Sequence, residues 1–209
     1  MIRHFETKER DSKQRKSKPI ILLIVEGQNK TENLYFRHFI QQNLPFNLRI
    51  ITPGRTTDPK GMLEHLQNYW KRNGLDEKSG DLGYIILDLD CNDKKGNTIR
   101  KLNKGLSSTK FIISNPCFEV WFLLHYKYTT HIFKDGSELI TELRKHIKDY
   151  EKNKDIYALL LHNTATAIEN SKKLVVHFNT DNSSWPSNTC NPRTDVHILL
   201  EMFNKLQKS

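Results

Sequence analysis

The sequence predicts an α/β fold in which a mostly parallel sheet is flanked by helices, with an α-helical annex at the C-terminal end. Three observations lead to this expectation. Short apolar runs that suit buried strands alternate with segments of helical periodicity over the first part of the chain. The connections between these segments are short, which implies parallel strands joined by right-handed crossovers. The last third has helical periodicity and no comparable strand run.

Composition limits the class of protein. The chain has 209 residues, of which 36% are hydrophobic, enough for one core with an appended subdomain. Its net charge of +9 favours a polyanionic partner, and a basic protein without such a partner is an equal alternative. Cys91, Cys117 and Cys190 form no C-x-x-C pair, which favours a reducing compartment. With no apolar run of membrane length and a charged N-terminus, we expect a cytoplasmic protein without a membrane partner.

The chain divides into three parts. Residues 1–18 are dense in charge and lack a periodic apolar face, so we expect a basic, flexible tail. Such a tail could follow a phosphate backbone, but a solvated tail is the simpler interpretation. Residues 19–130 carry the alternating strands and helices and form the sheet domain. Residues 131–209 form the helical annex packed on it.

The first strand ends at a carboxylate. Its apolar run covers residues 19–25 and is followed by Glu26 and Gly27, where a parallel sheet would place a cleft. Thr31 is expected to cap the helix that extends to about Gln41. A second strand over residues 48–51 leads to Asp58 and a helix with Pro59 at its first position.

Two aspartates follow the most apolar strand, over residues 83–90. In an extended chain, residues two apart point to the same side, so Asp88 and Asp90 are expected to project together beyond the sheet. They would repel each other unless a cation lies between them, and Mg²⁺ prefers such oxygen ligands. The alternative is a pair that caps a helix or faces solvent. After a loop over residues 92–97, a short helix is expected over residues 98–103.

The fourth strand, residues 110–114, runs directly into a helix. Asn115 is a suitable N-cap and Pro116 a suitable first residue, so the helix would begin at the carboxyl end of a strand. Its first-turn N–H groups could hold a phosphate there. The annex is expected to contain three helices and a final one capped by Thr194; the three cover residues 137–150, 155–162 and 164–176.

A family resemblance rests on several short stretches. The carboxylate-Gly junction after the first strand and the later Asp-x-Asp resemble the signature of the Toprim domain, shared by topoisomerases, bacterial primases and OLD-type nucleases. More specifically, the chain resembles the RloB family from about Pro19 to Leu206. The matching stretches are Val25-Glu26-Gly27, Lys30-Thr31-Glu32, the run Ser-Asn-Pro-x-Phe-Glu-x-Trp-x-x-x-His from Ser114 to His125, and Asn191-Pro192-Arg193-Thr194-Asp195.

This resemblance implies a function. RloB proteins resemble the Toprim halves of phage-defence pairs of the AbiL kind, whose partner is an ABC/AAA-type ATPase. The implied activity is a Mg²⁺-dependent endonuclease that cuts RNA, tRNA in particular, or DNA during abortive infection. Mn²⁺ is the alternative ion, and a homodimer is an open alternative. A primase-like nucleotidyl transferase and a non-catalytic basic module that docks on nucleic acid or the ATPase are the competing functions.

The resemblance and the strand ends together give a predicted site. Glu26, Asp88 and Asp90 would hold the metal, and Glu119, early in the helix after the fourth strand, would complete the catalytic set. One or two ions are both compatible with this set. The substrate would be contacted by Lys30, Asn115 and His125.

Three residues have two interpretations each. Glu32 is expected to interact favourably with the helix dipole from the first turn of its helix, and a catalytic role is the alternative. His125 follows Trp121 by one helical turn and is expected to be a core histidine, against the functional role that the resemblance suggests. Trp185 is expected to cover the annex, although it could stack on a base.

Overall fold

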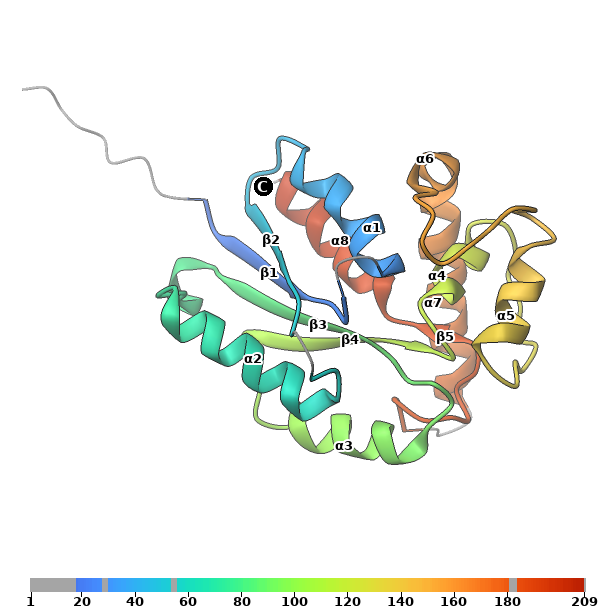
Figure 1. The fold of residues 1–209 in the computed structure, drawn as a ribbon, viewed down its shortest axis with the longest axis horizontal. Coiled ribbons are helices and arrows are strands. Elements are labelled where there is room, and N and C mark those ends of the chain that lie inside the picture. Colours follow the sequence, from blue (N-terminus) through green and yellow to red (C-terminus); the bar gives the residue numbers. More distant parts are fainter. Residues whose placement is uncertain (1–17, 28–29, 54–55, 181–183, 209) are drawn as a thin grey trace, which may run out of the picture.

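The computed structural model describes residues 18–27, 30–53, 56–180 and 184–208 (Figure 1). Five strands form one sheet in the order β2-β1-β3-β4-β5. Four of them are parallel, and β5 pairs antiparallel with β4. This confirms the predicted α/β class with a mostly parallel sheet. The strands are β1 (Ile20–Ile24), β2 (Asn47–Ile51), β3 (Leu82–Asp88), β4 (Thr109–Asn115) and β5 (Arg193–Thr194).

Helices cover both faces of this sheet. Figure 1 shows α2 and α3 on one face, α1 and α8 on the other, and α4 to α7 gathered beyond one end. The helices are α1 (Thr31–Ile40), α2 (Pro59–Arg72), α3 (Asp93–Asn103), α4 (Glu119–Leu124), α5 (Gly136–Leu143), α6 (Tyr157–Leu160), α7 (Thr164–Thr180) and α8 (Val196–Gln207), with 3₁₀ turns at Glu77–Ser79 and Leu161–Asn163.

Alternation along the strands divides the core into two layers. In β1, Ile21 and Leu23 pack with the aromatic residues of α1 and α4, whereas Leu22 and Ile24 pack with α2 and α3. This is the period of two expected for a strand buried on both faces. The apolar side chains of each strand are therefore buried only when helices cover both faces of the sheet.

Local signals predicted α2 correctly. Asp58 is its N-cap and accepts hydrogen bonds from the N–H groups of Lys60 and Gly61, both at 3.1 Å, and Pro59 is its first residue. The start of α3 was predicted wrongly. Asn92 accepts from the N–H groups of the second and third helical residues and thereby starts the helix at Asp93, five residues before the expected position.

Two other predicted caps are wrong. The cap position of α1 is Lys30, and the Thr31 hydroxyl points into the molecule instead. Asn115 belongs to β4, the Asn115–Pro116 peptide bond is cis, and α4 begins only at Glu119. The Asn115 amide is occupied elsewhere, because it accepts from the N–H of Cys91 at 3.1 Å and donates to the carbonyl of Cys190 at 2.9 Å.

The C-terminal third differs in detail from the expected three helices. α5 ends at Leu143, residues 155–162 form only the short α6 and part of a 3₁₀ turn, and α7 extends to Thr180. Thr194 lies in β5, a strand that was not predicted, and the last helix follows it. Phe203 of α8 packs against Phe39 at 5.3 Å between ring centroids, so this helix returns to the sheet domain.

Two expectations about the division of the chain are not tested by the structure. The predicted tail lies outside the described residues except for Lys18, and the division at residue 130 stays a prediction. In the described part of the chain, no helix combines the length and the apolar character needed to cross a membrane.

Candidate active site

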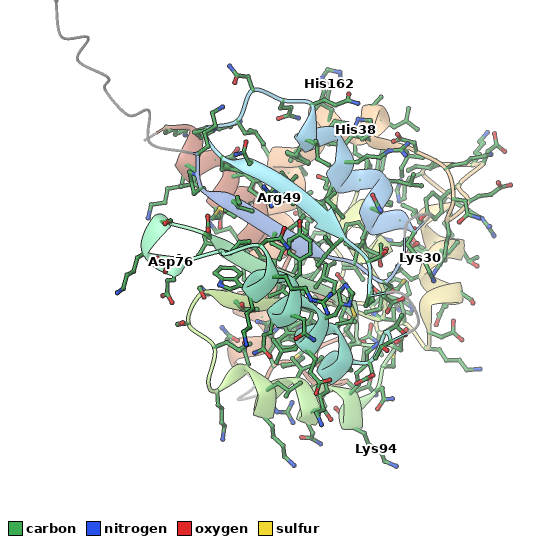
Figure 2. The ribbon with its side chains drawn as sticks, turned by 60° about the vertical axis from the view of Figure 1, so that its left-hand side comes forward. Lys30, His38, Arg49, Asp76, Lys94 and His162 are labelled. Atoms are coloured by element: carbon green, nitrogen blue, oxygen red, sulfur yellow. The ribbon has the colours of Figure 1, made fainter. Side chains whose placement is uncertain are left out.

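Four carboxylates gather at the carboxyl ends of two neighbouring parallel strands. Glu26 lies two residues after β1, Asp88 is the last residue of β3, Glu32 lies in the first turn of α1, and Glu119 is the first residue of α4. We call these four residues the acidic cluster. Figure 2 shows Lys30 at this end of the sheet and Asp76 at the opposite end. The cluster thus lies where ligands bind in open α/β sheets.

The electrostatics of Asp88 show that the four groups act on one another. Its side chain is half-buried, and burial is the largest cause that holds its pKa well above the usual range. The negative charges of Glu32, Glu119 and Glu26 raise that pKa further, in that order. Like charges disfavour ionisation of a neighbour in this way when no cation compensates them. The cluster therefore has a deficit of positive charge.

Glu119 is the most deeply buried member and the best held. It is 1% exposed, and its Oε1 atom accepts hydrogen bonds from the hydroxyls of Thr31 at 3.1 Å and Tyr150 at 2.8 Å. Its Oε2 atom lies 3.9 Å from the Lys152 ammonium. These hydroxyl contacts fix the orientation of the Glu119 carboxylate.

Glu32 is buried without full compensation. It is 4% exposed, and its Oε2 atom has no hydrogen-bond partner within the described residues. Burial first, then the charges of Glu26 and Glu119, raise its pKa to about 7. Glu32 lies in the first turn of α1, as the helix-dipole interpretation expected, but its burial was not predicted. The signal for burial was the helical spacing that places Glu32 on the same face as Tyr35 and Phe36.

Glu26 connects the cluster to the surface. Its side chain is partly exposed, and its Oε2 atom lies 3.9 Å from the ammonium of Lys30, four positions later in the sequence. Both Glu26 and Asp88 keep some solvent contact, unlike Glu32 and Glu119. The acidic cluster is therefore open on the side of the first two residues and closed on the side of the other two.

Asp90 does not project beside Asp88 as an extended chain would require. The strand ends at Asp88, and Asp90 has a φ of 56°, in the left-handed region. Its carboxylate is 63% exposed and forms an ion pair of 2.8 Å with Lys95. Its charge raises the pKa of Asp88 less than those of the other three carboxylates do. The geometric argument that paired these two aspartates is wrong, and Asp90 lies at the rim.

The three predicted substrate-binding residues differ in access. Lys30 is exposed at the mouth of the cluster. Asn115 is fully buried, and its amide holds the loops around Cys91 and Cys190. His125 is 2% exposed, its Nδ1 atom lies 2.8 Å from the carbonyl of Trp121, and burial lowers its pKa to about 4. The structure therefore brings only Lys30 to a position where a substrate could touch it.

Trp185 also has an internal role. It is half-buried between the two layers of the core, and its Nε1 atom donates to Asp195 at 2.7 Å. The guanidinium of Arg193 lies over its ring, 4.5 Å from the centroid. Through these contacts the Trp185 ring covers residues of the C-terminal part of the chain, which agrees with the preferred interpretation that it covers the annex rather than stacks on a base.

Two residues that contact the acidic cluster were missed in the sequence. Tyr150 and Lys152 lie between α5 and α6, more than 30 positions after Glu119, yet both reach it. Burial lowers the pKa of Lys152, but the charges of Glu119, Asp88 and Glu32 outweigh that effect and the pKa is raised. No local pattern marks these two residues, because only the return of the chain brings them to the cluster.

The donor set of the cluster suits a hard divalent cation. It consists of carboxylate oxygens, which Mg²⁺ and Mn²⁺ prefer. Two observations indicate negative charge that is not compensated. Among the described residues, one buried Glu32 oxygen has no hydrogen-bond partner, and the pKa of Asp88 is raised. Among the described side chains, however, no three from His, Cys, Asp and Glu already stand in an arrangement that could hold one ion. Side-chain rotation would be needed to bring them together.

Comparison with known proteins gives one match. The family model described as RloB-like protein matches residues 21–203, from β1 to α8, and includes the whole acidic cluster. No curated protein and no solved structure matches the chain.

Proposed function

The chain belongs to the RloB-like protein family, and from that membership and the acidic cluster we propose that it is a metal-dependent nuclease. The observation that carries the proposal is the buried Glu32 oxygen, which has no hydrogen-bond partner among the described residues while the pKa values of Glu32 and Asp88 are raised by neighbouring carboxylates. A protein that only bound a phosphate backbone would gain nothing from such a cluster, since it repels phosphate. A divalent cation between carboxylates and phosphate removes that conflict.

Each member of the cluster has a part in this proposal. Glu26, Glu32, Asp88 and Glu119 would hold Mg²⁺ or Mn²⁺, and Asp90 would act from the rim. When bound, the ion neutralises the scissile phosphate and lowers the pKa of the attacking water.

The protein's own groups then position the substrate. Thr31 and Tyr150 hold the Glu119 carboxylate in one orientation, so the rotation that ion binding requires would fall on the other members of the acidic cluster. The Lys30 ammonium at the mouth adds positive charge where a phosphate backbone would approach. The net charge of +9 supports the same polyanionic substrate.

We propose RNA, tRNA in particular, as the substrate, with DNA as the alternative, and a role as the effector of an abortive-infection system with an ABC/AAA-type ATPase. Both rest on the resemblance to Toprim effectors. An ATPase gene beside this one would support the defence role. Absence of such a gene across several genomes that encode close relatives would count against it.

A cleavage assay tests the nuclease directly. Labelled tRNA, single strands and duplex DNA are incubated with Mg²⁺ or Mn²⁺, with chelator, and with the variants Asp88→Ala and Glu26→Ala. We expect cuts that require the ion and fall by at least about a hundredfold in both variants. Templated synthesis would indicate a nucleotidyl transferase instead, and ion-independent binding without product would indicate a non-catalytic module.

A further inference from the structure

One ammonium group reaches the deepest member of the acidic cluster from a distant part of the chain. Lys152, between α5 and α6, places its Nζ atom 3.9 Å from Oε2 of Glu119. Glu119 is 1% exposed, whereas the Lys152 side chain is 53% exposed. The lysine therefore extends from the surface to the buried carboxylate, and about half of its side chain is in contact with solvent.

The main chain at Lys152 is held firmly while its side chain is not. The Thr31 hydroxyl lies 3.0 Å from the carbonyl of Lys152 and 3.1 Å from Oε1 of Glu119, and it can donate to either oxygen. Two residues earlier, the Tyr150 hydroxyl donates to the same Oε1 atom. By contrast, the ammonium of Lys152 is too far from Oε2 for a hydrogen bond, so only charge attraction holds it there. A stronger cation could displace it without disturbing the backbone.

The charge balance of the cluster gives a reason for such displacement. Among the described residues, the ion pairs of the cluster are those of Lys30 with Glu26 and of Lys152 with Glu119. Two single positive charges face four carboxylates, and one Glu32 oxygen has no hydrogen-bond partner in the described part of the chain. A divalent ion supplies more charge in less volume than an ammonium group, and it would repel the ammonium at this separation.

We propose that Lys152 is a built-in counter-ion of the acidic cluster, that a divalent ion displaces it from Glu119, and that the displaced ammonium then binds a phosphate oxygen of the nucleic acid. This inference rests on the proposed function, because it assigns a role to a residue of that same site. It explains why the exposed Lys152 side chain places its ammonium beside the buried Glu119 carboxylate. It also explains how the cluster avoids four uncompensated charges before the ion arrives.

Ion binding without turnover tests the first step. Mn²⁺ is titrated calorimetrically into the wild type and Lys152→Met, in which methionine keeps an apolar stem and loses the charge. We expect Mn²⁺ to bind about tenfold more tightly to Lys152→Met, because the ion no longer competes with an ammonium group. Lys152→Arg, which keeps the charge, should bind Mn²⁺ as the wild type does.

Lys154→Met is the matched control. Lys154 lies on the same segment, is 49% exposed and pairs with the exposed Glu151 at 3.9 Å, outside the acidic cluster. Its variant should change the Mn²⁺ affinity less than about twofold, because the lost charge lies outside the site. Thermal melts of all variants verify that they are folded.

Nucleic-acid binding tests the second step. With Ca²⁺ in place of Mg²⁺ to slow cleavage, fluorescence anisotropy should show that Lys152→Met binds a labelled oligonucleotide about fivefold more weakly, as expected for one lost phosphate contact. Equal Mn²⁺ affinity in the wild type and Lys152→Met would overturn the inference and leave the nuclease proposal standing. No Mn²⁺ uptake by the wild type would contradict the nuclease proposal itself.

Discussion

At the scale of single residues, Glu32 determines the electrostatic state of the site. It is buried, the charges of Glu26 and Glu119 raise its pKa, and one of its oxygens has no hydrogen-bond partner in the part of the chain that the structure describes. Because its folded pKa of about 7 lies above the ordinary value of 4.5, the protonated form stabilises the fold, and this contribution is lost as the pH rises through 7. The residue thus lowers stability at neutral pH, as functional groups often do.

Glu32→Gln should stabilise the metal-free protein and abolish ion binding. At pH 8 the change removes a buried charge, and the free energy of unfolding should rise by about 1–3 kcal/mol. Urea denaturation in the presence of chelator measures this, with Glu151→Gln as the exposed control. A loss of stability instead would mean that the Glu32 carboxylate is a structural anchor and not an unpaired ligand.

His125 should stay neutral far below the pH at which an ordinary histidine titrates. Its folded pKa of about 4 lies below the usual 6.5, so the folded protein binds fewer protons between these values than the unfolded chain does. The free energy of unfolding contributed by His125 is therefore complete above pH 6.5 and is lost as the pH falls toward 4. A histidine NMR titration tests this, and a midpoint near 6.5 would show that the ring is accessible to solvent and to substrate.

At the scale of elements, α3 is held by close contact with the loop before β5. A β-carbon placed on Gly96 of this helix would lie 2.5 Å from the carbonyl oxygen of Pro186. The neighbouring Arg100 donates to the same carbonyl, which further fixes the loop. The glycine is thus required by the approach of another backbone, since a helix interior would otherwise favour alanine.

Gly96→Ala should therefore destabilise the protein despite the higher helix propensity of alanine. Propensity alone would contribute about 1 kcal/mol in favour of the change. The clash with a backbone carbonyl should outweigh it and lower the free energy of unfolding by about 1–3 kcal/mol. Denaturant unfolding measures the difference, and Lys101→Ala on the exposed side of α3 is the control. Stabilisation by Gly96→Ala would show that the loop does not pack on this helix.

At the scale of the whole molecule, the family match and the observed fold confirm the predictions that rested on local sequence signals. The strand runs, the Asp58 cap and Pro59 predicted their elements because each depends on neighbouring residues alone. Glu26, Asp88 and Glu119 were predicted as a group because they lie at or just beyond strand ends, and parallel strands bring those ends to one edge.

The remainder depended on tertiary structure. Asp90 was misplaced because the strand gives way to a left-handed turn, which an apolar run followed by Asp-x-Asp does not reveal. Glu32 was undervalued because its burial depends on the packing of α1 against distant elements. Lys152 was missed because its position near Glu119 follows from the course of the chain after α5.

Binding of a divalent ion should stabilise the whole molecule. An ion that binds the folded state alone raises the free energy of unfolding by about 2.7 kcal/mol at one hundred times its dissociation constant. We expect Mn²⁺ to raise the melting temperature of the wild type by several degrees, and of Asp88→Asn by far less. Equal shifts in both proteins would place the bound ions elsewhere on the surface.

The most direct test of the central claim is anomalous diffraction from crystals grown with Mn²⁺. The account predicts an anomalous peak within coordination distance of Asp88 and at least two of Glu26, Glu32 and Glu119, with the Lys152 ammonium turned away from Glu119. A well-ordered cluster without such a peak at saturating Mn²⁺, with Lys152 still beside Glu119, would contradict it.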